Sequence, residues 1–482
     1  MDIKLLKKVH IVGIGGCASS AVAEYLVRRN IVVTGSEKKE RGGLEKLEAL
    51  GVKIFYGHNK KNVLEYGERP DIVLYSPAVT SLDPNNPELS ASRENKIQLS
   101  SWQSFIGKYL SGIGKTGITI SGSEGKGTTG GILTAILKDT EFDPLSILGA
   151  KIKGIANGED SNIYLGSGST YILEADEYNR NFFNYSPDIN VMINFQYEHP
   201  ETYKNFEEYK EAFYKYFTNM RGRKTLIFRA TDNIVDFAKQ YSINKTHKII
   251  WFGEDKRVLS KTTGDKYYIE NHKLSENGNY FNISHSDGNI DIHLPFLPGY
   301  IVSNAVGALL AAKELGLQID KIINNIKNFK GMVRRFDVAK TIGTGAIVAD
   351  YGHSPESINC IVGELRNIYK GKKIHLIFQP HLFSRTYNFF DDFILALKKA
   401  DKISVVDIYP AREKEEEWKD RVSSEMLYEE LKRLGAEVYF VGDRANLYEK
   451  LIDKIDPNEA TCFIGAGDMD LYYDKLIKNF IQ

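Results

Sequence analysis

The repeated alternation of short apolar segments with helical ones constrains the fold of this chain most. Near the start, KVHIV (8–12) leads into the glycine turn GIGG and then into the helical pattern SSAVAEYLVRR. Further strand-like segments follow at 31–36, 53–57 and 71–76. Strands that alternate with helices predict a parallel sheet with right-handed crossovers. We therefore expect a Rossmann-like domain over residues 1–112.

The alternation continues beyond residue 112. GITIS (117–121) precedes a second glycine turn and the helical segment TTGGILTAILKD. Strand-like segments then lie at 171–176, 189–194, 225–230 and 248–253. The stretch 255–295 alternates polar and apolar residues between Asn-Gly turns, which predicts a small antiparallel insertion. A helix at 303–315 closes this central domain, which we expect over 113–330.

The last third of the chain, 331–482, predicts a second Rossmann-like domain. Helical patterns separate its strand-like segments, which are AIVADYG, IHLIFQP, KISVVDIYP, EVYFVG and TCFIGAG. The expected fold class is therefore α/β with three domains.

Composition excludes several classes of protein. The 63 Lys and Arg residues equal the 63 Asp and Glu residues, which argues against a general nucleic-acid binder. Three widely separated cysteines do not form a zinc motif or a disulfide framework. The N-terminus runs straight into a strand, and no apolar run approaches the roughly 20 residues of a membrane helix. We expect a cytoplasmic protein without a membrane segment.

The first glycine turn carries Gly13, Gly15, Gly16 and Ala18 between a strand and a helix. Glycines there permit a tight turn and close approach of a phosphate, and the helix N-terminus favours an anion. The run fits G-x-G-x-x-A, and Glu37 ends the second strand, where an acid that binds ribose would lie. Nucleotide binding is favoured over a purely structural turn, and the identity of the nucleotide stays open.

The second glycine turn reads GSEGKGTT (122–129), again between a strand and a helix. Its backbone N–H groups, its lysine and its hydroxyls are the parts of a phosphate cradle. Only the shorter G-x-x-G-K pattern fits, because Ile120 stands where the full motif needs its first glycine. Two such turns favour a protein that handles two nucleotides over a dehydrogenase, which needs one dinucleotide fold.

Acidic residues and a histidine follow two strands of the central domain. Glu174, Asp176 and Glu177 end one strand-like segment, and Glu198 and His199 follow the next. Strand ends of a parallel sheet face the ligand crevice, and Mg²⁺ prefers carboxylate oxygens and substrate phosphates. We expect Glu174 and His199 to meet near the phosphates.

Charged residues also follow the strands of the third domain. Each of these residues alone is commonly structural, but loops that converge at one sheet edge favour a functional site. Arginine can form bidentate hydrogen bonds with a carboxylate or a phosphate group. The residues are Arg334, Arg335, Asp350, His353, His381 and Arg385.

Together these motifs resemble the Mur ligase family, and within it the UDP-N-acetylmuramate–L-alanine ligases. Their order and spacing span nearly the whole chain. The segments are HIVGIGGCASS, GSEGKGTT, EADEYNRNFFNYSPD, NFQYEHPETY, GMVRRFD, DYGHSPESI, FQPHLFSRT, DIYPAREK and GAGDMD.

The resemblance implies a UDP-binding domain, a central P-loop-type ATPase domain and a mobile C-terminal domain. It also implies ATP and Mg²⁺ as cofactors, and UDP-N-acetylmuramate and L-alanine as substrates. The implied reaction phosphorylates the lactoyl carboxylate and then lets the amine of alanine attack the acyl phosphate. A monomer or a homodimer is expected.

Site residues follow from the resemblance position by position. The expected UDP contacts are Gly13, Gly15, Gly16, Ser36 and Ser76. The expected ATP contacts are Gly122, Ser123, Glu124, Gly125, Lys126, Gly127, Thr128, Thr129, Asn304 and Arg334. The expected metal ligands are Thr128, Glu174 and His199. The expected substrate-side groups of the C-terminal domain are His353, His381 and Arg385, and the expected catalytic residues are Lys126, Glu174, His199, His353 and Arg385.

The phosphate loop departs from the family pattern GTHGKTTT. Glu124 replaces the histidine, and Gly127 replaces the hydroxyl residue after the lysine. Gly127→Thr is accordingly expected to preserve or raise activity. Three readings stay open: an active ligase, a ligase with another amino-acid or muropeptide substrate, and a catalytically weak nucleotide-binding homologue.

Overall fold

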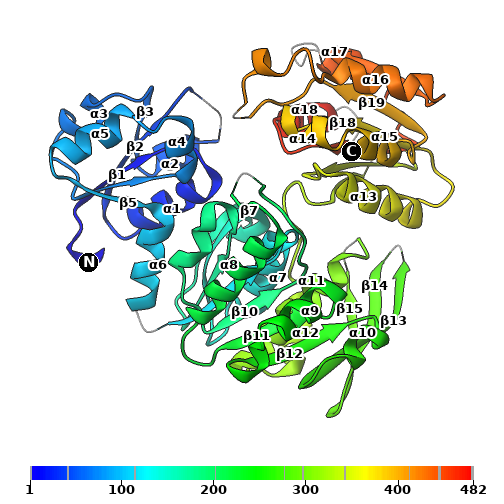
Figure 1. Ribbon diagram of the computed structural model, residues 1–482, viewed down its shortest axis with the longest axis horizontal. Coiled ribbons are helices and arrows are strands. Elements are labelled where there is room, and N and C mark those ends of the chain that lie inside the picture. The colour runs from blue at the N-terminus through cyan, green and yellow to red at the C-terminus, as the bar shows by residue number, and fades with distance from the viewer. Residues whose placement is uncertain are drawn as a thin grey trace. The chain divides into compact units, whose positions relative to one another are not determined.

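The computed structural model describes residues 3–40, 43–112, 115–200, 202–275, 277–295, 298–340, 343–411, 413–442 and 447–478. The chain forms two compact units. One comprises residues 1–272, 280–294 and 300–331, and the other comprises 273–279, 295–299 and 332–482. Figure 1 shows three sheets with helices packed on their faces.

The first sheet confirms the predicted parallel arrangement. Its strand order is β3-β2-β1-β4-β5, and the pairings are parallel. The strands are β1 (Lys8–Val12), β2 (Val32–Glu37), β3 (Lys53–Tyr56), β4 (Ile72–Tyr75) and β5 (Gln98–Ser101). The helices are α1 (Cys17–Val27), α2 (Glu45–Ala49), α3 (Lys61–Leu64), α4 (Pro77–Leu82), α5 (Pro87–Glu94) and α6 (Trp102–Gly112). The strand order reverses between β1 and β4, and a ligand crevice is expected at the carboxyl ends of such strands.

The second sheet has ten strands in the order β15-β14-β13-β12-β11-β10-β6-β9-β7-β8. The strands of its middle are β6 (Thr116–Ser121), β9 (Thr170–Glu174), β10 (Ile189–Met192), β11 (Thr225–Arg229) and β12 (Lys248–Gly253). These five pair in parallel, with β6 between β9 and β10. Residues that follow β6, β9 and β10 are thereby brought to one edge.

The helices of this part pack apolar faces onto the sheet. They are α7 (Lys126–Leu137), α8 (Phe206–Thr218), α9 (Asp232–Gln240), α10 (Lys256–Ser260), α11 (Ile301–Leu315) and α12 (Ile319–Ile326). Helix α8 shows why the sequence folds this way. Its aromatic residues recur at helical spacing, so Tyr209, Phe213 and Tyr216 lie on one face and are fully buried.

Two segments of the second sheet differ from expectation. A long antiparallel hairpin of β7 (Leu145–Ala156) and β8 (Glu159–Leu165) extends one edge. At the other edge, β13 (Asp265–Ser275), β14 (Gly278–His285) and β15 (Gly288–Leu294) continue the central sheet, and β13 pairs with β12 in parallel. The expected insertion at 255–295 is therefore part of the main sheet.

The third sheet has the order β16-β17-β21-β18-β19-β20. Its strands are β16 (Asp337–Lys340), β17 (Ala346–Asp350), β18 (Ile374–Phe378), β19 (Lys402–Val406), β20 (Val438–Gly442) and β21 (Ala460–Ile464). Its helices are α13 (Pro355–Ile368), α14 (Phe383–Asn388), α15 (Phe390–Leu397), α16 (Ser424–Arg433), α17 (Leu447–Ile452) and α18 (Met469–Ile477). The five strands predicted from the sequence are present, and β16 adds an antiparallel edge.

The strands of the three sheets come from 8–101, 116–294 and 337–464. The domain boundaries after residues 112 and 330 stay predictions. In the described part of the chain, no helix combines the length and the apolar character needed to cross a bilayer.

Candidate functional site

The second glycine turn is a strained loop between β6 and α7. Gly122 has φ +120° and Gly125 has φ +79°, which L side chains rarely adopt, so glycine is needed at both positions. Asn194, just beyond β10, fixes the loop. Its side-chain oxygen accepts the Glu124 N–H at 3.0 Å, and its amide donates to the Glu124 carbonyl at 3.1 Å. The sequence analysis did not identify this asparagine, whose one signal is its place after a strand.

Asn304 holds the same loop from α11. Its Nδ2 donates to the Gly125 carbonyl at 3.1 Å, and a Cβ on Gly125 would lie only 2.6 Å from that nitrogen. Asn304 therefore shapes the loop at Gly125. Its expected contact with adenine stays a prediction.

Two side chains expected to bind ATP, those of Ser123 and Thr129, are hydrogen-bonded or buried within the protein. The Ser123 hydroxyl donates to the Gln196 carbonyl at 3.0 Å and accepts the Gln196 N–H at 2.9 Å. Thr129 has no exposed surface. Ser123 thus links the loop to the segment after β10, and the Thr129 side chain is buried within α7. Their expected contacts with ATP stay predictions.

Lys126, the first residue of α7, points back over its own loop. Its Nζ donates to the Gly122 carbonyl at 2.7 Å and the Ser123 carbonyl at 3.3 Å, and lies 3.0 Å from Glu177 Oε2. Burial opposes its charge, but the carboxylates of Glu177 and Asp176 outweigh burial and raise the pKa of Lys126. Lys126 is thus a fixed cation at the mouth of the loop.

Glu177 is the internal counterion of this lysine. It is fully buried, and burial alone would raise its pKa, but Lys126 and the ring of His199 keep the pKa below its ordinary value. Beside it, burial and the charge of Glu177 raise the pKa of Asp176. Burial, acting against Lys126, raises the pKa of the half-buried Glu198 to about 7.

The group of described residues that could hold a metal ion is Asp176, Glu177 and His199, with one ligand atom of each within 4.8 Å of the others. His199 adopts φ +57°, a left-handed conformation. Its carbonyl accepts the Thr202 N–H at 2.8 Å, which fixes the backbone. Mg²⁺ commonly binds through one or two protein carboxylates together with substrate phosphates. The two acids of the group fit such an ion.

The expected metal set of Thr128, Glu174 and His199 does not form that group. The Glu174 carboxylate instead accepts the Gly149 N–H at 2.5 Å, and Thr128 is buried. A Cβ on Gly127 would lie 3.1 Å from Glu174 Oε1. The Glu174 carboxylate therefore packs against Gly127 and Gly149, which have no side chains. Metal binding by Thr128 and Glu174 stays a prediction.

The first glycine turn lies where the order of its sheet reverses. Gly13 has φ +77°, and a Cβ there would meet Ser76 Cβ at 3.4 Å, so the ends of β1 and β4 touch. The Gly15 N–H donates to Glu37 Oε2 at 2.8 Å, and the Gly16 N–H donates to the Gly13 carbonyl at 3.3 Å. The expected positions Gly13, Gly15, Gly16 and Ser76 therefore gather at one crevice edge.

The side chain of Ser36 is engaged inside the domain, and its expected contact with the substrate stays a prediction. It is fully buried, and its hydroxyl donates to Glu88 Oε2 at 2.5 Å. The same carboxylate lies 3.1 Å from His58 Nδ1 and accepts from Asn62 Nδ2 at 2.5 Å. Burial would raise the pKa of Glu88, but His10, His58 and Ser36 lower it to about 2.

Three residues expected on the substrate side of the C-terminal domain lie close together, and their role stays a prediction. The rings of His353 and His381 lie 6.0 Å apart, and Arg385 Nη1 is 3.5 Å from His381 Nδ1. Burial, followed by the charge of Arg385, lowers the pKa of His353 to about 3. The cluster thus combines a neutral imidazole with a permanent cation.

Arg334 is engaged with the main chain. Its Nη2 donates to the carbonyls of Gly465 at 3.1 Å and Gly467 at 3.0 Å, which follow β21. Asp350 accepts the N–H groups of Phe336 and Gly352, each at 2.7 Å. Arg334 therefore ties two loops together in this structure, and its expected nucleotide contact stays a prediction.

Three protein-family models match successive parts of the chain. Residues 8–112 match the Mur ligase family catalytic domain, 120–312 match the Mur ligase middle domain, and 334–467 match the Mur ligase glutamate ligase domain.

Relatives and solved structures extend the match to the whole chain. The UDP-N-acetylmuramate–L-alanine ligase of Clostridium acetobutylicum is 32% identical over 474 residues, 97% of each chain. That of Aquifex aeolicus is 30% identical over 475 residues, 98% of each chain. The crystal structure of UDP-N-acetylmuramate-alanine ligase from Thermotoga maritima superposes with a TM-score of 0.80 at 25% identity, covering 98% of this chain and 99% of that one. The chain therefore belongs to the Mur ligase family.

Proposed function

We propose that this protein uses ATP to join L-alanine to the lactoyl carboxylate of UDP-N-acetylmuramate, in the synthesis of peptidoglycan precursors. The observation that carries the proposal is full-length similarity to ligases of that name in a chain whose phosphate loop places Lys126 beside buried carboxylates. ATP and the nucleotide sugar are both soluble metabolites, so we assign the reaction to the cytoplasm. The oligomeric state of the protein, a monomer or a homodimer, stays a prediction.

The chemistry requires activation because a carboxylate is a poor electrophile. Transfer of the γ-phosphoryl group from ATP to a lactoyl oxygen gives an acyl phosphate and ADP. The amine of alanine then attacks the acyl carbon, the C–N bond forms, and phosphate leaves with the carboxylate oxygen. The protein contributes alignment and charge stabilisation, as in other phosphoryl transfers.

Lys126 and the loop amides carry the first step in this proposal. The ammonium group is held at the loop by the Gly122 and Ser123 carbonyls, and the N-terminus of α7 adds partial positive charge. Bound Mg²⁺ would neutralise negative charge on the phosphates, and Asp176, Glu177 and His199 are the residues that would hold it. Lys126 must then leave Glu177, at least in part, to reach a phosphate oxygen.

The C-terminal cluster serves the amino acid in this proposal. Arg385 offers a permanent positive charge, which suits the carboxylate of alanine. His353 is uncharged at neutral pH because its pKa is about 3, so it adds hydrogen bonding and no second charge. These contacts would orient the amine for attack.

A phosphate-release assay tests the proposal. It uses ATP, Mg²⁺, UDP-N-acetylmuramate and each of the twenty amino acids in turn. Turnover with L-alanine well above the others is the expected result. Preference for another amino acid or a muropeptide would favour the related-ligase reading, and no release with any acceptor would favour a nucleotide-binding homologue. Lys126→Ala should abolish turnover, and retained turnover would contradict the loop assignment.

A further inference from the structure

A cavity of about 390 Å³ lies at the far end of α7 from the phosphate loop. Residues from the end of α7, from strand β7 and from the segment after α12 line it. Helix α7 runs over 12 residues from Lys126 to Leu137, so its two ends are separated by about 17 Å at 1.5 Å per residue. The cavity is therefore separate from the loop expected to bind ATP.

Positive charge dominates the lining of this cavity. It comprises four lysines, Lys138, Lys153, Lys327 and Lys330, against one acid, Asp139, among the described residues. These side chains come from three separate segments of the chain. A net charge of three positive units in one concave site focuses field lines and attracts anions.

Two of the lysines are placed in the cavity by their surroundings. Lys138 Nζ donates to the Ile155 carbonyl at 3.4 Å. Lys330 extends over Gly154, where its Cδ and Nζ lie 3.5 Å from the position that a glycine Cβ would take. Lys330 is therefore in van der Waals reach of the β7 backbone at Gly154, which adopts φ +61°. The cavity thus has two ammonium groups positioned along the same stretch of β7.

We propose that this cavity is a second anion site, which binds a diphosphate group such as that of a nucleoside diphosphate. The net charge of the lining matches a diphosphate better than a single phosphate. The volume falls within the roughly 300–1,000 Å³ of small-molecule sites, so a sugar or nucleoside can accompany the diphosphate. Lysine is a common binder of phosphate groups as a point charge.

The position of the site gives it a regulatory use. The Lys153 N–H donates to the Gly331 carbonyl at 3.1 Å, and Gly331 is the last residue of the first compact unit before the chain continues at Met332. A ligand held by Lys153 and Lys330 therefore lies next to one of the points where the chain passes from the first unit to the second. A diphosphate metabolite would in this way act on the enzyme without touching the ATP loop.

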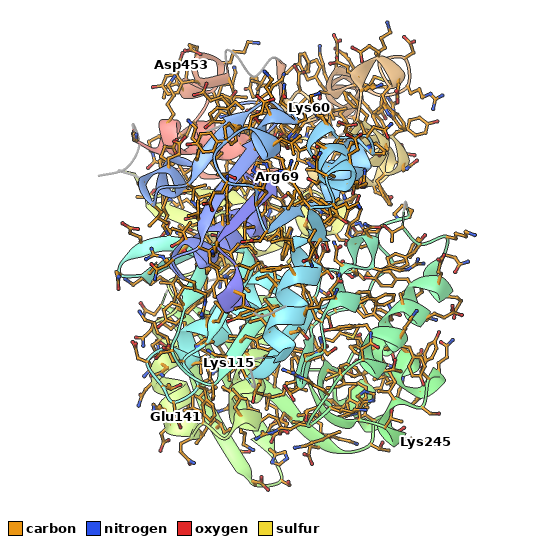
Figure 2. The ribbon with its side chains drawn as sticks, turned by 90° about the vertical axis from the view of Figure 1, so that its left-hand side faces the viewer. Lys60, Arg69, Lys115, Glu141, Lys245 and Asp453 are labelled. Atoms are coloured by element: carbon orange, nitrogen blue, oxygen red, sulfur yellow. The ribbon has the colours of Figure 1, made fainter. Side chains whose placement is uncertain are left out.

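Isothermal titration calorimetry with inorganic pyrophosphate tests the proposal. The wild-type protein is first saturated with Mg²⁺, a non-hydrolysable ATP analogue and UDP-N-acetylmuramate, which fill the two nucleotide sites of the proposed function. The test variant is Lys327→Ser/Lys330→Ser, because both side chains are exposed and their loss should not disturb folding. The matched control is Lys239→Ser/Lys245→Ser, which removes the same charge from exposed positions of the same unit. Figure 2 shows Lys245 on the opposite side of this part of the molecule from Glu141, which lies in the loop after α7.

The expected result is one pyrophosphate site in the saturated wild type that weakens at least tenfold in the test variant and is unchanged in the control. Stronger binding of UDP than of pyrophosphate at that site would identify a nucleoside diphosphate, and equal binding would identify the diphosphate alone. The absence of a site sensitive to Lys327 and Lys330 overturns the proposal. An equal loss in the control also overturns it, because the binding would then reflect overall charge.

Discussion

Replacement of Glu177 by glutamine isolates the ion pair on which the phosphate loop depends. The substitution keeps the shape of the side chain and removes its charge. In the structure this carboxylate lies 3.0 Å from Lys126 Nζ, and the two side chains are only 1% and 14% exposed. Lys126 would keep the carbonyls of Gly122 and Ser123 but lose its nearest anion.

The expected loss of stability follows from burial. Removal of one partner from a buried ion pair typically costs about 3–5 kcal/mol, because the other charge is left uncompensated. Glutamine can still accept a hydrogen bond from Lys126, and the nearby Asp176 supplies part of the missing charge, so the lower end applies. About 3 kcal/mol corresponds to a fall of roughly 6–12 °C in the Tm of a part of 150–250 residues.

Differential scanning calorimetry measures this fall, with Glu124→Gln as the matched control. Glu124 lies in the same loop and is exposed, so its neutralisation should change stability by less than about 0.5 kcal/mol. Lys126→Met/Glu177→Gln completes a double-mutant cycle and should recover part of the loss. If Glu177→Gln lowers the Tm no more than the control does, the pair does not stabilise the loop and the reasoning fails.

Three further predictions concern other parts of the molecule. Folding lowers the pKa of Glu88 from 4.5 to about 2, so Glu88 contributes about 3 kcal/mol that is present above about pH 4.5 and lost as the pH falls towards 2; urea unfolding at several pH values should show a weaker acid dependence in Glu88→Gln, and an unchanged one would contradict the prediction. Gly127→Ala should stabilise α7 by up to about 1 kcal/mol yet reduce phosphate release, since its Cβ would crowd Glu174 Oε1 at 3.1 Å; threonine carries the same Cβ, so the structure argues against the gain expected of Gly127→Thr from the family pattern, and full activity of either variant would mean that this carboxylate can move freely. Arg385→Met should raise the pKa of His353 from about 3 towards its ordinary value, because it removes the second cause of that shift; NMR titration of the His353 ring measures the change, and a constant pKa would contradict a contribution from the charge of Arg385.

The sheets could be predicted because their strands are recognisable locally. The segments that became β1 and β18 are short, apolar and fully buried, and glycine turns or helices follow them. Strand β5, with the sequence QLSS, carries no apolar run and was not predicted. The β7–β8 hairpin was missed for a related reason: Leu145–Ala156 contains two glycines and alternating lysines that weaken its strand pattern.

The position of the candidate site in the fold could be predicted from the sequence, but the contacts of its side chains could not. Motif spacing located the phosphate loop and the acids after β9, because parallel strands end at one edge. It could not tell that His199 would meet Glu177 at 3.6 Å while Glu174 turned to the Gly149 N–H. Ser36 shows the same limit, since its partner Glu88 lies 52 residues away and only tertiary packing brings the two together.

The carboxylate of Glu37 has a consequence for what the first glycine turn can recognise. The Gly15 N–H already donates to the Glu37 carboxylate. A negatively charged side chain of the protein therefore occupies this amide of the turn. A phosphate brought to the same amide would meet like charge, whereas a hydroxyl could donate to the carboxylate and gain a hydrogen bond. The turn should therefore select the sugar end of a nucleotide, and the diphosphate should lie where amide groups are not taken by Glu37.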